Sequence, residues 1–161
     1  MKIFLFLVLS LIILNTNSLA TNFTISTANT KFNNIKAKKI LNNYLNKINF
    51  DLKGKKEINF FLSTKEEIKT KVPFIFNKIK EFKNDGFIIE LINNTIYIVG
   101  INKRSLIYGI YSFLENSLNC KFLSSTFEII PEKTNLREED INFISEARFN
   151  YREIFIKELE D

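Results

Sequence analysis

Very few side chains of this sequence are suited to nucleophilic or metal chemistry. Histidine is absent from all 161 residues, which excludes Ser-His-Asp and Cys-His nucleophiles and removes the commonest metal ligand. Cys120 is the only cysteine, so the chain has no internal disulfide and no thiolate zinc site. A catalytic cysteine would need a neighbouring base, and none is visible near Cys120. We therefore expect Cys120 to be a buried structural residue, and we expect no metal or other cofactor.

Carboxylates are the remaining groups that could catalyse a reaction without a cofactor. Hydrolysis of a glycosidic bond requires two of them, roughly 5–10 Å apart across a cleft. Glu128, Glu153 and Glu158 are candidates, but no pattern in the sequence brings two of them together. The sequence therefore does not favour independent catalysis, although it leaves open whether the chain belongs to an enzyme.

The net charge of +5 comes from lysines that are interspersed with carboxylates. Binding of nucleic acid would require a basic stripe with exposed aromatic residues between the charges, which this sequence lacks. We expect a solvated, mildly basic surface and no nucleic-acid partner. The alternative is partner binding through the charged face of a helix expected at residues 30–49. That face carries Lys36, Lys38, Lys39 and Lys47.

The first twenty residues have the composition of a secretory signal peptide. Lys2 precedes an apolar run over residues 3–14, and the small residues Ser18 and Ala20 stand at positions −3 and −1 of a cleavage point after Ala20. The apolar run is shorter than the roughly 20 residues that a membrane-spanning helix needs. We expect an exported protein, periplasmic or secreted, that is not stably inserted in a membrane after cleavage.

Hydrophobic periodicity and capping residues predict three helices of two turns or more. They cover residues 30–49, capped by Thr30, residues 74–82 after Pro73, and residues 103–118, capped by Asn102. Ser63 and Glu66 fit a capping box that opens a short helical turn. Gly109 lies in the middle of the third helix, where it costs roughly 1 kcal/mol relative to alanine. We therefore expect this helix to approach the sheet closely at Gly109.

Short runs of β-branched and aromatic residues predict the strands. They cover residues 22–26, 58–62, 87–92, 95–99 and 127–131. The 58–62 strand is apolar throughout and is expected at the centre of the sheet. The pair Asn93-Asn94 predicts a type I′ hairpin. Residues 51–56 and 132–140 are polar and predict linkers, and residues 142–155 return to an extended aromatic pattern.

Several short motifs follow one another in a fixed order along the chain. They are Asp85-Gly86-Phe87, Arg104, Tyr108-Gly109, Leu114-Glu115, Glu128 to Pro131, and Phe149 to Glu153. This series resembles the small α/β domain that precedes the catalytic barrel in α-glucuronidases, in β-N-acetylhexosaminidases and in a related bacterial group. Ser105 replaces the glycine that usually follows the arginine. The resemblance extends over roughly residues 21–155, which is nearly all of the chain after the signal peptide.

The resemblance implies an α+β fold in which helices pack on a single mixed β-sheet. In such enzymes the catalytic carboxylates lie on the (β/α)₈ barrel, which needs about 250 residues, and not on the small domain. After the signal peptide at 1–20, the resemblance implies an accessory domain at 21–131 and a linker with the start of a missing barrel at 132–161. On this basis we expect the chain to be inactive alone, as a product truncated or split before its barrel or as an orphaned accessory domain.

The resemblance also implies one substrate contact. In the hexosaminidase relatives an RF-x-x-R segment supplies an arginine that hydrogen-bonds sugar hydroxyls, and residues 148–152 match this spacing. Arg152 is therefore the candidate substrate-binding residue. The alternative is a surface arginine that pairs with Glu153 or Glu158. Arg104, at the start of a helix, is expected to be structural.

Two functional hypotheses follow from the sequence. The first is an exported, non-catalytic accessory domain of a glycoside hydrolase, whose partner is a separate catalytic barrel. The second is a free-standing periplasmic or secreted domain that binds a carbohydrate, or a protein through exposed aromatic residues such as Tyr151 and Phe155. A shared fold hosts many functions, so the fold alone does not decide between them.

Overall fold

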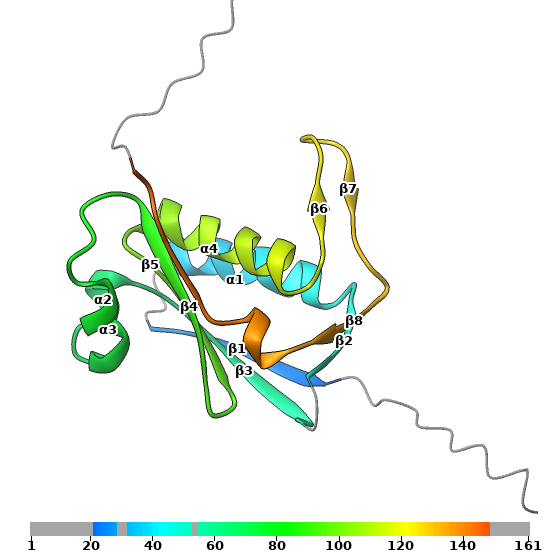
Figure 1. Cartoon of the computed structure of the whole chain (residues 1–161), viewed down its shortest axis with the longest axis horizontal. Coiled ribbons are helices and arrows are strands. Elements are labelled where there is room, and N and C mark those ends of the chain that lie inside the picture. Colours follow the sequence, from blue (N-terminus) through cyan, green and yellow to red (C-terminus); the bar gives the residue numbers. More distant parts are fainter. Residues whose placement is uncertain (1–20, 29–31, 53–54, 149–161) are drawn as a thin grey trace, which may run out of the picture.

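The computed structural model describes residues 21–28, 32–52 and 55–148 of the chain. Within these ranges the fold is α+β and is built on one five-stranded sheet, in the order β1-β3-β5-β4-β9 (Figure 1). The strands are β1 (Asn22–Thr27), β3 (Glu57–Thr64), β5 (Thr95–Gly100), β4 (Gly86–Ile92) and β9 (Phe143–Glu146). The first three run parallel, β4 is antiparallel to β5, and β9 is antiparallel to β4. The expected α+β class with a mixed sheet is confirmed.

Helices cover both faces of this sheet. On one face lie α1 (Phe32–Leu45) and α4 (Lys103–Asn116), and on the other lie the short helices α2 (Lys65–Ile68) and α3 (Pro73–Ile79) (Figure 1). Neighbouring residues of β3 point to opposite faces. Phe60 is fully buried against Phe113 of α4. Phe61 packs with Tyr97 on the side of α3, so the alternation along β3 separates the two apolar clusters.

Two small sheets complete the described structure. In the first, β2 (Asn49–Leu52) pairs in parallel with β8 (Lys133–Leu136). In the second, β6 (Lys121–Phe122) pairs with β7 (Glu128–Ile129) as a hairpin that projects beyond the helices (Figure 1). A short 3₁₀ turn, Glu138–Asp140, connects β8 to β9. Across the described ranges, no helix is long and apolar enough to cross a membrane.

The structure confirms the main strands and corrects the turn between two of them. Strands occur at 22–26, 58–62, 87–92 and 95–99 as expected, and β3 is central, between β1 and β5. Asn93 and Asn94 link β4 to β5, but only Asn93 has a positive φ, of 55°. A type I′ turn requires positive φ at both central residues, so the type I′ prediction is wrong although the hairpin is present.

Parts of the two predicted linkers form strands instead. Helix α1 ends at Leu45 rather than near Asn49, and residues 49–52 form β2 instead of a link. Residues 133–136 form its partner β8. Both segments alternate polar and buried side chains, with Phe50, Leu52 and Leu136 at most 2% exposed. The strands were not predicted because these segments are polar in overall composition, although every second side chain is buried. Thr30, the predicted cap of the first helix, lies outside the described residues.

The helix boundaries on the other face also differ from the predictions. The capping box is formed by Thr64 and Glu67, one residue later than expected, since the Thr64 backbone N–H donates to Glu67 Oε2 at 3.0 Å. Helix α3 ends at Ile79 rather than at residue 82. Phe74, in the first turn of α3, is 46% exposed and rests edge-on against Tyr97.

The last predicted strand, at 127–131, is reduced to the two residues of β7. This strand pairs only with β6 and stays outside the five-stranded sheet. Helix α4 ends at Asn116 rather than at residue 118, and Leu118 is nevertheless fully buried. The extended pattern expected from residue 142 onward is present as β9 over residues 143–146.

Candidate functional site

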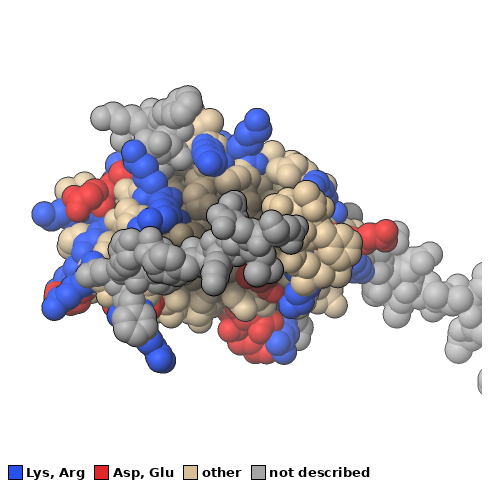
Figure 2. All heavy atoms as spheres, turned by 90° about the horizontal axis from the view of Figure 1, so that it is seen from above, with Lys and Arg blue, Asp and Glu red and all other residues tan. Residues whose placement is uncertain are grey.

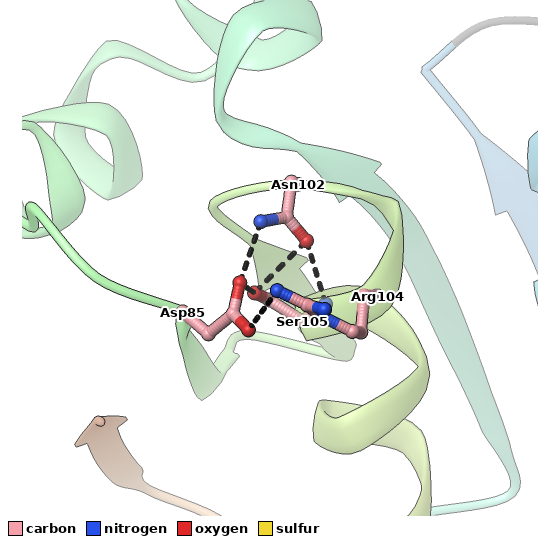
Figure 3. A network of polar contacts seen from close by, with 4 residues as sticks. All are labelled: Asp85, Asn102, Arg104 and Ser105. Carbon is pink, nitrogen blue, oxygen red and sulfur yellow. Dashed lines mark hydrogen bonds and ion pairs between the residues drawn. The ribbon is translucent and has the colours of Figure 1, made fainter. Parts of the chain in front are cut away.

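Asp85 joins the start of β4 to the start of α4 through a compact polar network (Figure 3). Asn102 caps α4, because its Oδ1 accepts a hydrogen bond of 2.9 Å from the Ser105 backbone N–H. The Nδ2 of Asn102 donates to Asp85 Oδ1 at 2.7 Å. Arg104 pairs with the other carboxylate oxygen of Asp85 at 2.6 Å. Each oxygen of Asp85 therefore has its own donor.

The network keeps the Asp85 carboxylate ionised. Its side chain is only 10% exposed, and burial alone would raise its pKa. The hydrogen bond from Asn102, followed by the positive charge of Arg104, outweighs burial and lowers the pKa of Asp85 below its usual range. A carboxylate held in this way is unsuited to act as a general acid.

Two glycines allow α4 to pack against the sheet beside this network. Gly100 ends β5, and a Cβ at this position would collide with the backbone of Ser105 and Leu106. A Cβ on Gly109 would lie 3.0 Å from Ile98 Cγ2 and 3.3 Å from Phe87 Cβ. The expected close approach of helix to sheet at Gly109 is confirmed, and Phe87 and Tyr108 are brought to one side of α4.

A groove runs between the outer side of α4 and strand β9, and we refer to it as the α4–β9 groove. Its volume is about 330 Å³. It is lined by Asp85, Phe87, Tyr108, Tyr111, Ser112, Glu115, Ser145 and Ala147. Phe87 is almost fully buried and contacts the Phe143 ring edge-on, whereas Tyr108 is 43% exposed. The groove therefore combines aromatic rings, hydroxyls and two carboxylates, and none of the described lysines and arginines lines it.

A second hollow lies on the other side of the polar network, at the carboxyl ends of β3 and β5. Its volume is about 540 Å³. It is lined by Thr64, Glu66, Glu67, Ile101, Asn102, Lys103 and Arg104. Charges of both signs line this hollow, and it contains no aromatic residue. It is larger than the α4–β9 groove but is lined by none of the described aromatic rings, whereas Tyr108 and Phe87 line the groove.

The β6–β7 hairpin forms an exposed apolar surface, which we call the apolar hairpin. Leu123, Phe127 and Ile129 are 61%, 58% and 49% exposed. Its tip is ordered by Ser124, whose Oγ accepts hydrogen bonds from the backbone N–H groups of Thr126 and Phe127. Large apolar side chains gathered on a projecting element are typical of an interaction surface.

Glu128 anchors the base of the apolar hairpin to α1. The Tyr44 hydroxyl donates to Glu128 Oε2 at 2.6 Å, and Lys47 lies 3.5 Å from Oε1. Burial of the phenol, followed by its hydrogen bond to Glu128, raises the pKa of Tyr44. Glu128, one of the three candidate catalytic carboxylates, is thus held between Tyr44 and Lys47.

Three other residues singled out in the sequence, Arg104, Cys120 and Arg148, are described by the structure, whereas the candidate substrate contact and the residues around it are not. Arg104 is structural in position, since it pairs with Asp85. Cys120 is fully buried, and burial raises the pKa of its thiol to about 11. Arg148 is exposed. The candidate substrate contact Arg152, together with Tyr151, Glu153, Phe155 and Glu158, lies outside the described residues.

Charges on the described surface are mixed, and potential metal ligands are scattered. On the face shown in Figure 2, Lys and Arg side chains lie mostly around the rim, with carboxylates between some of them. The described part of the chain contains no group of three or more Cys, Asp or Glu residues that could hold a metal ion. The chemistry available at the candidate site is therefore binding through aromatic, hydroxyl and carboxylate groups.

The sequence signal for the α4–β9 groove was present but incomplete. Tyr108, Tyr111, Ser112 and Glu115 recur at helical spacing beside the buried stripe of α4, and this marks a second face of the helix. The opposite wall comes from Ser145 and Ala147, and only the pairing of β9 with β4 brings it there. Comparison of the chain with protein-family models and with curated proteins gives no match.

Proposed function

We propose that this chain is an exported, non-catalytic accessory domain of a glycoside hydrolase, with the fold of the α/β domain that precedes the barrel in α-glucuronidases and β-N-acetylhexosaminidases. One observation carries the proposal. Residues of the first three motifs that suggested the resemblance meet at one place in the fold. Asp85 pairs with Arg104, Phe87 lies under Gly109, and Tyr108 lines the same groove as Asp85. Residues that interlock in this way support a shared fold more strongly than short motifs alone.

The state of the carboxylates supports a non-catalytic role. Asp85 is held ionised by Asn102 and Arg104. Glu128 is bound by Tyr44 and Lys47. A glycosidase needs one carboxyl group that stays protonated near neutral pH and a second that is free to act as nucleophile or base. Asp85, with its lowered pKa, is therefore unsuited to the acid role.

The apolar hairpin supports a role as a domain that packs against a partner. Three large apolar side chains, Leu123, Phe127 and Ile129, are about half exposed or more on a projecting element. A catalytic domain packed on this hairpin would bury them, and each fully buried side chain of this size contributes about 1.5–3 kcal/mol of transfer free energy.

Two measurements test the accessory role. The protein with residues 21–161, assayed with chromogenic glycosides and glucuronides, should give no turnover above buffer. Turnover that follows the purified protein through successive columns would contradict the proposal. Sequencing of the DNA beyond the codon for Asp161 gives an independent answer. A reading frame that encodes a barrel of about 250 residues supports the accessory role, and unrelated sequence there argues against it.

The second candidate function is a free-standing carbohydrate- or protein-binding domain, and the α4–β9 groove favours it. Calorimetry with a panel of uronic acids and amino sugars tests this function. Saturable heat that is weakened by Arg152→Ala would support a sugar-binding domain in which Arg152 contacts the ligand. Absence of heat across a broad panel, with the protein folded, would count against it.

A further inference from the structure

We infer that the α4–β9 groove binds a small organic cation, with an ammonium group seated between the Tyr108 ring and the carboxylate of Glu115. This inference goes beyond the accessory role and does not depend on a catalytic partner. At about 330 Å³ the groove is near the lower end of the range of ligand pockets, so it fits a small molecule rather than a peptide segment.

Two groups that line the groove, the Tyr108 ring and the Glu115 carboxylate, are available to a ligand. Among the described residues, the Tyr108 side chain has no hydrogen-bond or ring partner, and the Glu115 carboxylate has no hydrogen-bond or ion-pair partner. Tyr108 is 43% exposed, and Glu115 is also exposed. Tyr108 and Glu115 lie two helical turns apart along α4 and line the same groove. Both groups therefore gain interactions when a cation enters.

The charge of the lining selects the sign of the ligand. Asp85 and Glu115 contribute two carboxylates, and the low pKa of Asp85 keeps it ionised. Arg104 balances Asp85, but its own side chain is 65% exposed and lines the second hollow rather than the α4–β9 groove. An anion would thus meet repulsion in the groove, whereas a cation would be attracted.

The aromatic lining selects the kind of cation. A metal ion requires several converging oxygen ligands, and the described residues offer no such group of carboxylates. Organic ammonium ions bind instead over the faces of tyrosine and phenylalanine rings, where the ring quadrupole attracts the charge. Tyr108 supplies such a ring at the mouth of the groove, and Phe87 supplies an apolar floor. The hydroxyls of Ser112 and Ser145 are placed to bind polar substituents of the ligand.

Titration with choline, followed by the amide chemical shifts of the full chain, tests the inference. Saturable shifts are expected for residues of α4 and β9 that line the groove. Tyr108→Ala and Glu115→Gln should each weaken binding about three- to tenfold, while Tyr108→Phe should retain most of the affinity. Higher salt should weaken binding, since the groove and its ligand have opposite charges.

Matched controls separate the groove from the general surface. Phe74→Ala removes an aromatic side chain that is 46% exposed on the opposite face of the sheet, and it should leave choline affinity unchanged. Glu132→Gln removes an exposed carboxylate outside the groove and should also have no effect. Glucosamine should bind, whereas glucose and glucuronate should not. Equal binding of glucose and glucosamine, or absence of saturable shifts with choline, would overturn the inference.

Discussion

Asp85 links the start of β4 to the start of α4 through a hydrogen bond with Asn102 and an ion pair with Arg104. Asp85→Asn keeps the shape of the side chain but removes the charge that pairs with Arg104, and it places an amide donor beside the donor of Asn102. Hydrogen bonds to charged groups contribute roughly 1.5–3 kcal/mol each, so we expect Asp85→Asn to lower the free energy of unfolding by about 2 kcal/mol. Urea unfolding at pH 7 measures this change.

The same substitution should have a pH-dependent effect. The pKa of Asp85 is lowered in the folded state, so its stabilisation is present above the unfolded value of about 3.8 and is lost as the pH falls through the lower folded pKa. The stability difference between wild type and Asp85→Asn should therefore shrink when unfolding is repeated near pH 3. A difference that stays constant with pH would show that the carboxylate charge is not what stabilises the network. Glu132→Gln, at an exposed carboxylate, is the control.

Gly109 is a residue at which packing opposes helix propensity. An alanine there would gain about 1 kcal/mol of propensity in the middle of α4. Its Cβ would lie 3.0 Å from Ile98 Cγ2 and 3.3 Å from Phe87 Cβ, and both neighbours belong to the core. Because overpacking costs about 1–3 kcal/mol, we expect Gly109→Ala to be destabilising by roughly 1 kcal/mol net. Thermal unfolding tests the sign, and a stabilised variant would mean that α4 moves away from the sheet without cost.

At the scale of elements, the sequence correctly predicted those helices and hairpins that are formed by residues close together along the chain. The β4–β5 hairpin needs only a two-residue link, and α4 carries its own cap in Asn102, so both were correctly located. The parallel pair of β2 and β8 joins residues about eighty positions apart, such as Phe50 and Thr134. No local pattern encodes that pairing. The groove was missed for the same reason, since β9 forms its second wall through pairing with β4.

The apolar hairpin is an element that the fold itself does not need to bury. Leu123 and Phe127 are 61% and 58% exposed, so replacing both by serine should change the free energy of unfolding by no more than about 0.5 kcal/mol. The doubly substituted protein should bind less of the dye anilinonaphthalene sulfonate, which reports exposed apolar surface. Unchanged dye binding would show that the apolar hairpin is not the main exposed apolar surface. A clear loss of stability would show instead that the hairpin contributes to the core.

At the scale of the whole molecule, the domain does not end where its sequence composition changes. Polar residues after position 131 predicted a linker, yet β8 pairs with β2 and β9 forms the edge of the main sheet next to β4. Leu136 and Ile141 are 1% and 0% exposed and belong to the main apolar cluster. Residues 132–148 therefore pack as part of the folded domain, and we expect them to unfold with it.

Two shortened proteins test this extent of the folded unit. A chain of residues 21–131 lacks β8, β9 and the buried side chains of Leu136 and Ile141. Truncating a single buried side chain of this size to alanine already costs about 2–5 kcal/mol of stability. Since a domain of this size has only about 5–15 kcal/mol of total stability, we expect residues 21–131 to be largely unfolded by circular dichroism. A chain of residues 21–148 should unfold cooperatively. Cooperative unfolding of residues 21–131 with the same midpoint would show that β8 and β9 pack on an already complete domain.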